Sequence, residues 1–145
     1  MDRAGFLDRL IGILSESGLR YCVIGGQGVN AYVQPVVSVN LEIAVATEDL
    51  AAAEALLRQH FRVERFPHSL NASEAGSDLR VQLQTDPRYA VFVQRAAPRS
   101  VLGLTLPVAS LGDVLQRKVW ATLDAGRRAS RRQKDLADIS RLLEA

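Results

Sequence analysis

One stretch, residues 21–45, constrains most strongly what this chain can fold into. The apolar run Tyr21–Ile24 is followed by Gly25-Gly26. A segment of mixed composition then reaches Pro35, and a run in which apolar and polar residues alternate ends at Val45. Alternation with a period of two is typical of a strand with one buried face, and a glycine pair marks a tight turn. The stretch therefore predicts two strands joined by a glycine turn, a short helix over 27–33 and a connector that begins at Pro35.

The second of these strands, over 39–45, carries polar residues on one side only. Leu41 and Ile43 belong to its apolar face, and Asn40 and Glu42 belong to the opposite face. Residues two apart on a strand point to the same side, so Asn40 and Glu42 lie next to each other. This pair is either the ordinary polar face of a half-exposed strand or two neighbouring ligands in a binding site.

Hydrophobic periodicity assigns most of the remaining chain. It predicts helices over 3–17, over 47–60 with Thr47 as N-cap, from Ser110 to about 124, and over 130–143. It predicts strands over 61–66, 79–84, 89–94 and 101–106, and a loop over 68–77. Strands that outnumber the helices between them favour an α/β fold with a mixed sheet flanked by helices. We expect one domain, 1–145, with a sheet core over 1–106 and a C-terminal helical pair over 107–145.

The composition excludes several classes of protein. The chain is 48% apolar and 23% charged, as in ordinary globular proteins, and it has no apolar run of the roughly 20 residues that a membrane span needs. Its first residues mix charged and apolar side chains, unlike a signal peptide, and its single cysteine, Cys22, permits no intrachain disulfide. His60 and His68 lack the spacing of metal ligands. We expect a cytoplasmic protein without a membrane partner.

Two C-terminal segments complete a larger pattern. They are L-P-V-A-S-L-G-D-V-L-Q-R-K-V-W-A at 106–121 and R-x-x-K-D-L-A-D-I at 131–139. Together with the Gly25-Gly26 turn and the V-N-L-E-I strand, they resemble the nucleotidyltransferase superfamily of the DNA polymerase beta type. The likeness is to its small bacterial members, including relatives of the AbiEii toxins of toxin–antitoxin systems. This resemblance spans nearly the whole chain and implies a nucleotidyltransferase fold, a bacterial source and a possible partner protein.

The resemblance also implies a metal site. Members of the superfamily hold two divalent cations with an acidic-x-acidic pair on one strand and a third acidic residue on a neighbouring strand. By position, Asn40, Glu42 and Gln82 match these three residues. Asn40 and Gln82 are amides, which bring oxygen but no charge, so Glu42 is the single candidate metal ligand. We therefore expect weak or absent transferase activity and no cofactor. The alternative is an active Mg²⁺-dependent enzyme that moves an NMP to a protein, RNA or small-molecule hydroxyl.

The glycine pair and a lysine are candidate phosphate ligands. Gly25 and Gly26 either let backbone N–H groups approach a phosphate or simply form a strand-to-helix turn with positive φ. Lys118 lies on the inner stripe of its predicted helix, where an unpaired charge is costly. We expect Lys118 to form a structural ion pair with Asp135 on the last helix, or to contact a ligand phosphate.

A basic segment separates the two C-terminal helices. It is either a solvated turn or a surface for phosphate or nucleic acid, and it contains Arg127, Arg128, Arg131, Arg132 and Lys134. Trp120 falls opposite Lys118 on its helix, which predicts packing on the last helix or on a second subunit, and hence a homodimer. The leading hypothesis is a nucleotidyltransferase-like protein that binds a nucleotide or another anion or acts through a partner. A nucleic-acid or protein-binding module is a further alternative.

Overall fold

A seven-stranded mixed sheet organises the protein, with strand order β3-β4-β5-β2-β1-β7-β6. The computed structural model describes residues 3–33 and 40–144. The central strands β1 (Tyr21–Ile24) and β2 (Asn40–Val45) pair antiparallel. β2 runs parallel to β5 (Arg80–Gln84), and β1 runs parallel to β7 (Leu104–Val108). The mixed α/β sheet expected from the sequence is confirmed, and Val39 and Pro35 lie outside the described residues.

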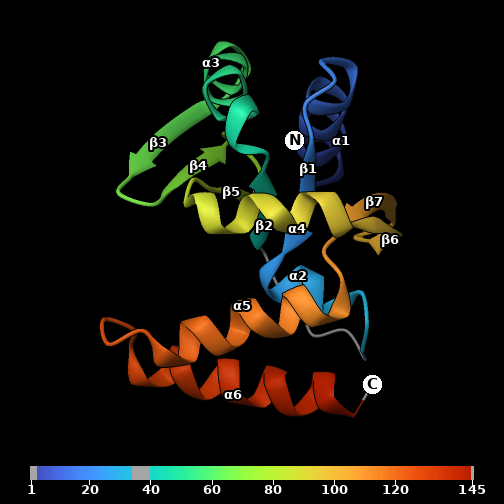
Figure 1. The fold of residues 1–145 in the computed structure, drawn as a ribbon. Coiled ribbons are helices and arrows are strands. Elements are labelled where there is room, and N and C mark those ends of the chain that lie inside the picture. Colours follow the sequence, from blue (N-terminus) through green and yellow to red (C-terminus); the bar gives the residue numbers. More distant parts are fainter. Residues whose placement is uncertain (1–2, 34–39, 145) are drawn as a thin grey trace.

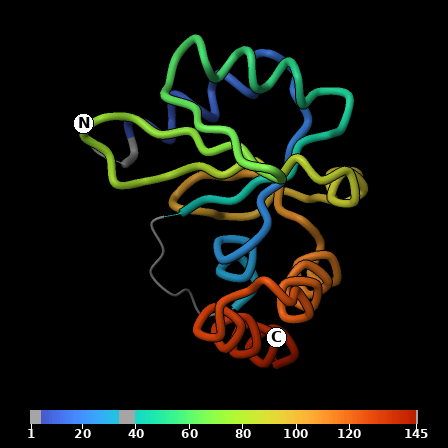
Figure 2. The backbone as a smooth tube through the Cα atoms, turned by 90° about the vertical axis from the view of Figure 1, so that its left-hand side faces the viewer, coloured from blue at the N-terminus to red at the C-terminus, as the bar shows by residue number. Residues whose placement is uncertain are grey.

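Helices cover the sheet on both faces. α1 (Arg3–Glu16) and α3 (Leu50–His60) form one core with Leu41 and Ile43 of β2. A second core on the other face joins Ala44 of β2 to α4 (Ala90–Arg95), α5 (Leu111–Leu123) and α6 (Ala129–Leu143). Figure 1 shows α1 and α3 at one end of the molecule and the α5–α6 pair at the other, and Figure 2 shows the same layers from the side. The alternation of β2 therefore divides its residues between the two cores, as the sequence predicts.

The Gly25-Gly26 pair is part of a helix rather than a turn before one. α2 (Gly25–Asn30) begins directly after β1, two residues earlier than predicted, and ends before the predicted residue 33. Gly25 has a φ of +67°, which an L side chain rarely adopts. Glycine thus lets the chain pass from strand to helix without a connecting residue.

The predicted loop over 68–77 is wrong, because residues Ser69–Ser73 form strand β4. β4 lies between β3 (Arg62–Phe66) and β5 and pairs antiparallel with both. Its Ser and Asn residues favour turns when taken alone. Pairing on both edges and the burial of Leu70 and Ala72 outweigh that local preference.

The strand predicted over 89–94 is also wrong, because these residues lie in α4 and in the turn before it. A short apolar run does not distinguish strand from helix. Here Asp86 accepts a hydrogen bond from the backbone N–H of Arg88 and starts a 3₁₀ turn over Pro87–Tyr89 that leads into α4. The helix then places Phe92 in the second core.

Two further boundaries differ from the prediction. The strand expected over 101–106 is a hairpin of β6 (Ala97–Val101) and β7, with Leu102 and Gly103 both at positive φ in its turn. Thr47 does not cap α3; Thr47–Asp49 form a 3₁₀ turn instead, and Asp49 accepts a hydrogen bond from the backbone N–H of Arg20. Within residues 3–33 and 40–144, no helix is long and apolar enough to cross a membrane.

Trp120 packs against α4 and the turn before it rather than on α6. Its ring is stacked on Phe92 with 5.9 Å between ring centroids and meets Tyr89 edge to face. These contacts hold α5 against α4 and the sheet. The homodimer expected from the sequence stays a prediction.

Ser110 caps the N-terminus of α5, because its hydroxyl accepts a hydrogen bond from the backbone N–H of Asp113 at 3.1 Å. Ser110→Ala should lower the free energy of unfolding by about 1 kcal/mol, the usual contribution of an N-cap. Urea denaturation followed by circular dichroism measures this difference. Ser140→Ala, on an exposed position of α6, is the control and should cause no loss. Equal stability of both variants would contradict the capping role.

Candidate functional site

The three strand positions matched by the resemblance lie together at one end of the sheet. Glu42 on β2 is in register with Gln82 on β5, and Asn40 lies two residues before Glu42. All three line a cavity of about 240 Å³. Gly25 and Gly26 at the start of α2 also line it, and its remaining walls come from α5, α6 and the turn between these helices. This cavity is the candidate functional site.

Glu42 is already paired with cationic and polar groups of the protein. Nη2 of Arg117 lies 3.2 Å from Oε2 of Glu42, and Nε2 of Gln84 donates a hydrogen bond to the same oxygen at 2.8 Å. Burial alone would lower the pKa of Arg117, but the negative charge of Glu42 outweighs it and the pKa lies above its usual value. Arg117 therefore keeps its positive charge beside Glu42.

Sequence reasoning missed both Arg117 and Gln84. Gln84 could have been found, because it lies two residues after Gln82 on the same face of β5. Arg117 could not, because its contact with Glu42 depends on how α5 docks against β2, and 75 positions separate the two residues. A helical wheel shows which residues share a face of one helix but not which strand that face meets.

The residues present do not fit a pair of divalent cations. Glu42 is the single carboxylate among the three matched positions, and one of its oxygens accepts two protein hydrogen bonds. Asn40 and Gln82 supply neutral amide oxygens. No group of three or more His, Cys, Asp or Glu residues suited to a metal occurs in the described part of the chain. Two Mg²⁺ ions need several anionic oxygens at close, near-octahedral distances, and this wall of the cavity offers a guanidinium instead.

Gly25 is required by the position of Glu42 as well as by its own φ. A Cβ atom built on Gly25 would lie 2.5 Å from Oε1 and 3.1 Å from Cβ of Glu42. At Gly26 the nearest such neighbour is Nζ of Lys134, at 3.9 Å. The predicted positive φ is therefore present at Gly25, as the first residue of α2, and the glycine also makes room for the Glu42 side chain. A phosphate contact by Gly25 or Gly26 stays a prediction.

Lys118 is held by two buried carboxylates on α6. Its Nζ lies 3.1 Å from Oδ1 of Asp135, the pair expected from the sequence, and 3.0 Å from Oδ2 of Asp138. Lys118, Asp135 and Asp138 are 6%, 1% and 3% exposed. Arg127 completes the group with two hydrogen bonds to Asp135 at 2.8 and 3.1 Å. These charges are costly to bury, and each is compensated by opposite charges in contact.

The basic segment divides into paired and exposed residues. Arg127 binds Asp135, Lys134 binds Asp138, and Arg132 donates to the backbone carbonyls of Asp124 and Arg127. Arg128 and Arg131 are exposed, and among the described residues neither forms an ion pair. Part of the segment therefore stabilises the turn between α5 and α6, and Arg131 lines the cavity.

The cavity carries an excess of positive charge. Its lining contains two carboxylates, Glu42 and Asp135, and five cationic side chains, which leaves three positive charges in excess. Asp138, which does not line the cavity, pairs with Lys118 and Lys134 and offsets part of this excess. The five cations are Arg117, Lys118, Arg127, Arg131 and Lys134. A partly enclosed cationic cavity attracts anions, and arginine in particular binds phosphate oxygens with two donors at once.

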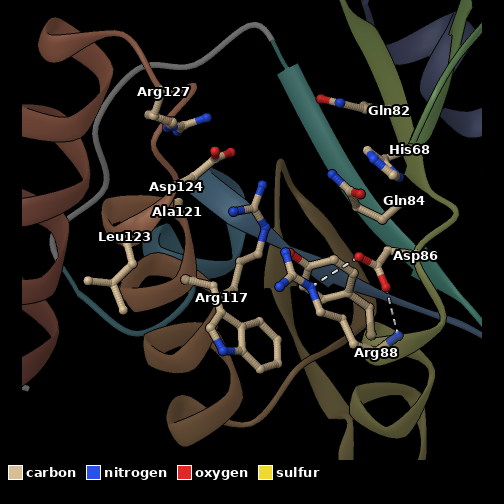
Figure 3. Close-up of a pocket in the computed structure, with 12 residues that line it drawn as sticks. His68, Gln82, Gln84, Asp86, Arg88, Arg117, Ala121, Leu123, Asp124 and Arg127 are labelled. Atoms are coloured by element: carbon tan, nitrogen blue, oxygen red, sulfur yellow. Dashed lines mark hydrogen bonds and ion pairs between the residues drawn. The ribbon is translucent and has the colours of Figure 1, made fainter.

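A wider cavity of about 610 Å³ adjoins this one and shares Gln82, Arg117 and Arg127 with it. Figure 3 shows its two sides. Gln82, Gln84 and Asp86 come from the β5 side. Ala121 comes from α5 and Asp124 directly follows that helix, and Arg117 and Arg88 point into the space between the two sides. The two cavities together form one cleft between the sheet and the C-terminal helices.

The architecture matches solved structures, although no protein-family model and no curated protein matches the sequence significantly. The antibiotic-resistance factor ANT(2'')-Ia superposes with a TM-score of 0.68 at 14% identity, over 97% of this chain and 84% of that protein. The lincosamide antibiotic adenylyltransferase LnuA, in its lincomycin-bound form, gives 0.63 at 10% identity, over 94% and 95% of the two chains. This chain has a nucleotidyltransferase fold.

A nucleotidyltransferase-like protein from Paracoccidioides brasiliensis is also similar, with a TM-score of 0.60 at 15% identity over 93% of this chain and 73% of that one. The expected fold class is thereby confirmed. Identities this low establish the fold and leave the roles of Asn40, Glu42 and Gln82 as predictions. The site has to be judged by its own chemistry.

Gly25→Ala should lower the free energy of unfolding by about 2 kcal/mol or more, since it adds a strained φ and a clash with Glu42. Gly12→Ala in α1 is the matched control, because a Cβ atom there meets nothing within 4 Å. The control should be neutral or stabilising by up to about 1 kcal/mol. Thermal denaturation measures both variants. Similar stabilities for the two would show that Gly25 is not constrained by Glu42.

Asp135→Asn should lower the free energy of unfolding at pH 7 by about 3 kcal/mol, because it leaves Arg127 and Lys118 with too little negative charge. Asp78→Asn, at an exposed position without an ion pair among the described residues, should change it by less than about 0.5 kcal/mol. Urea denaturation of the three proteins gives the comparison.

The effect of Asp135→Asn should depend on pH. Burial alone would raise the pKa of Asp135, but the hydrogen bonds from Arg127 and the charge of Lys118 outweigh it and hold the pKa below the usual value of 3.8. A carboxyl group with a lowered pKa in the folded state contributes its full stabilisation above pH 3.8 and loses it as the pH falls through the folded pKa. The difference between wild type and variant should shrink below that pH, and a constant difference would contradict the ion pair.

Proposed function

We propose that the protein binds the phosphate groups of a nucleotide or a similar phosphorylated ligand in the cationic cavity, with weak or no transferase activity. In this proposal Arg117 supplies the positive charge beside Glu42, and no divalent cation is needed. The observation that carries the proposal is the ion pair between Arg117 and Glu42 inside the cavity. The position next to Glu42, the single carboxylate among the three matched residues, is occupied by the guanidinium of Arg117.

The donor set of the cavity supports phosphate as the ligand group. Arg117 uses one nitrogen on Glu42, and its Nε is buried without a hydrogen-bond partner among the described residues. Arg131 is exposed at the cavity wall, and Lys134 has a side chain that is 60% exposed. Arg131 and the Nε of Arg117 can donate to phosphate oxygens without first breaking an ion pair, whereas Lys134 shares its charge with Asp138. Lys118 and Arg127, in contrast, are bound to buried carboxylates and act mainly by their charge.

An active Mg²⁺-dependent transferase is the second candidate. The likeness of the fold to LnuA, an adenylyltransferase, and to ANT(2'')-Ia, solved in complex with adenylyl-2''-tobramycin, favours it. In this candidate Glu42 would have to exchange Arg117 for a metal ion. Product formation from Mg·ATP and a hydroxyl acceptor that is lost on Glu42→Gln would establish it over the proposal above.

Binding of nucleic acid is a third candidate, favoured by the exposed Arg128 and Arg131 next to the cavity. It predicts a steep dependence of RNA or DNA affinity on salt. Replacing both arginines with alanine would reduce that dependence. Replacing Arg128 alone, which lines neither cavity, would also reduce it and would leave the affinity for a mononucleotide unchanged.

Arg117→Gln tests the proposal directly. Isothermal titration calorimetry with tripolyphosphate and with ATP, in EDTA and at low salt, should show binding to the wild type that weakens by about tenfold or more in the variant. The reason is that charge-assisted hydrogen bonds to phosphate are lost and Glu42 becomes an unpaired anion in the cavity. Arg62→Gln is the control, because Arg62 lies on β3 and is 77% exposed.

Three results would overturn the proposal. They are absence of binding to the wild type, binding that Arg117→Gln leaves unchanged, and binding that requires Mg²⁺ and disappears in EDTA. The last result would favour the transferase candidate instead.

A further inference from the structure

We propose that the outer edge of β3 is an interaction surface for a second copy of this chain, which adds its own β3 antiparallel and continues the sheet across a twofold axis. β3 ends the strand order of the described chain, and Figure 1 shows it on the side of the sheet opposite β6 and β7. Its residues line neither the cationic cavity nor the wider one. The inference therefore does not depend on the function proposed for that cleft.

The backbone of β3 offers hydrogen-bonding groups on that edge. Alternate residues of an antiparallel strand bond to opposite neighbours. The N–H of Thr85 donates to the carbonyl of His68, so the even-numbered residues of β4 bond to β5 and its odd-numbered residues bond to β3. The register of β3 against β4 then turns the N–H and C=O groups of Val63 and Arg65 away from the sheet. The carbonyl of Val63 accepts a hydrogen bond of 3.4 Å from Nη1 of Arg58, which agrees with this direction.

The opposite edge of the sheet is less suited to strand addition. In the β6–β7 hairpin Pro98 lies opposite Pro107, and neither residue has an N–H to donate. This pair therefore occupies a position without hydrogen bonds between the two strands, and Pro98 turns its nitrogen toward the edge. The N–H of Ser100 is the edge-facing donor that β6 keeps. β3 has two such donors and is the edge at which a strand can be added.

The side chains of β3 are complementary to themselves in one alignment. Nε of Arg62 lies 3.7 Å from Oε1 of Glu64, and the two side chains are 77% and 52% exposed. When Val63 lies opposite Val63 of the partner subunit, each Arg62 lies opposite Glu64 of the partner subunit. The four charges then alternate in sign across the axis. Opposite charges directly across two strands stabilise their pairing.

The neighbouring alignments bring like charges together. Edge-facing residues pair only with edge-facing residues, so the next alignment in one direction places Arg62 opposite Arg62 of the partner subunit. The next alignment in the other direction places Glu64 opposite Glu64 of the partner subunit. Like charges directly opposite each other are destabilising. Charge therefore selects one alignment, and it favours a second copy of this chain over an unrelated peptide.

Helix α3 leaves room for the second subunit at this edge. Arg58 reaches the edge-facing carbonyl of Val63, so the side of α3 that carries Arg58 faces the edge. Ala51 and Ala55 lie on the same helical stripe as Arg58 and are exposed. Their side chains are too small to hold the α3 helix of a second copy away from the edge.

The dimer places the two cationic cavities on one face of a continuous sheet. Glu64 is in register with Asn71, and Asn71 is in register with Gln82 at the cavity wall, so the three residues share a face. A strand added at the edge continues the same face in the second subunit.

Sedimentation velocity over a range of protein concentrations tests the proposal. Each subunit contributes a strand of 5 residues and one side of α3. Stable interfaces use roughly 20–30 residues a side, so we expect reversible association at about 10–500 µM protein. Arg62→Glu and Glu64→Arg each place like charges opposite each other and should weaken association by about tenfold or more. Arg128→Glu, a matched charge reversal at an exposed position before α6, should leave association unchanged.

The two reversals should compensate each other. The double variant Arg62→Glu/Glu64→Arg restores opposite charges in the proposed alignment and should associate like the wild type. A mixture of the two single variants should form heterodimers, because one chain then carries two acidic residues and the other carries two basic residues. Circular dichroism checks that all variants keep the fold.

Hydrogen exchange followed by NMR locates the interface. The amides of Val63 and Arg65 should exchange more slowly at protein concentrations at which the dimer forms, and the amide of Ser100 on the opposite edge should not change. Three results would overturn the proposal: a wild type that stays monomeric up to about 500 µM, a double variant that does not recover association, and a dimer in which the amides of Val63 and Arg65 gain no protection.

Discussion

The ion pair between Arg117 and Glu42 joins the C-terminal helices to the sheet, and the geometry of the cleft depends on it. Behind it, Lys118 and Arg127 bind the buried carboxylates of α6, so that α5 and α6 form one unit. Since isolated charges are not tolerated in such surroundings, each contact fixes the position of the next. The cleft is therefore held in shape by opposite charges from β2, α5 and α6.

The same pair changes what the nucleotidyltransferase fold can bind at this place. In the superfamily that the chain resembles, carboxylates attract metal ions and the metal ions attract phosphates. In this chain two of the three matched strand residues, Asn40 and Gln82, are neutral. The positive charge in the cavity comes from arginine and lysine side chains. A guanidinium fixed on a helix offers directional donors but does not activate a hydroxyl group as a metal ion does. The proposed binding of phosphate without efficient transfer rests on that difference.

Sequence patterns predicted the elements whose burial is periodic. The helices over 3–17 and 130–143 and the strands over 21–24 and 79–84 agree with the structure to within a residue. β4 and α4 were predicted wrongly, because Ser69–Ser73 gain strand structure from partners on both sides and Ala90–Arg95 gain helical structure from the cap at Asp86 and the packing of Phe92. The strand partners of Ser69–Ser73 and the core that receives Phe92 both lie outside the segments concerned.

The sequence by itself determined which chemical groups are available: amides at Asn40 and Gln82, one carboxylate at Glu42, and a lysine that needed an acidic partner, found in Asp135. These conclusions required only side-chain identity and the period of a strand or helix. Tertiary structure alone decided that Arg117 meets Glu42 and that Arg88 rests on Trp120. Those contacts join residues on separately formed elements, and the docking of a helix on a sheet is set by the whole core rather than by the residues that finally touch.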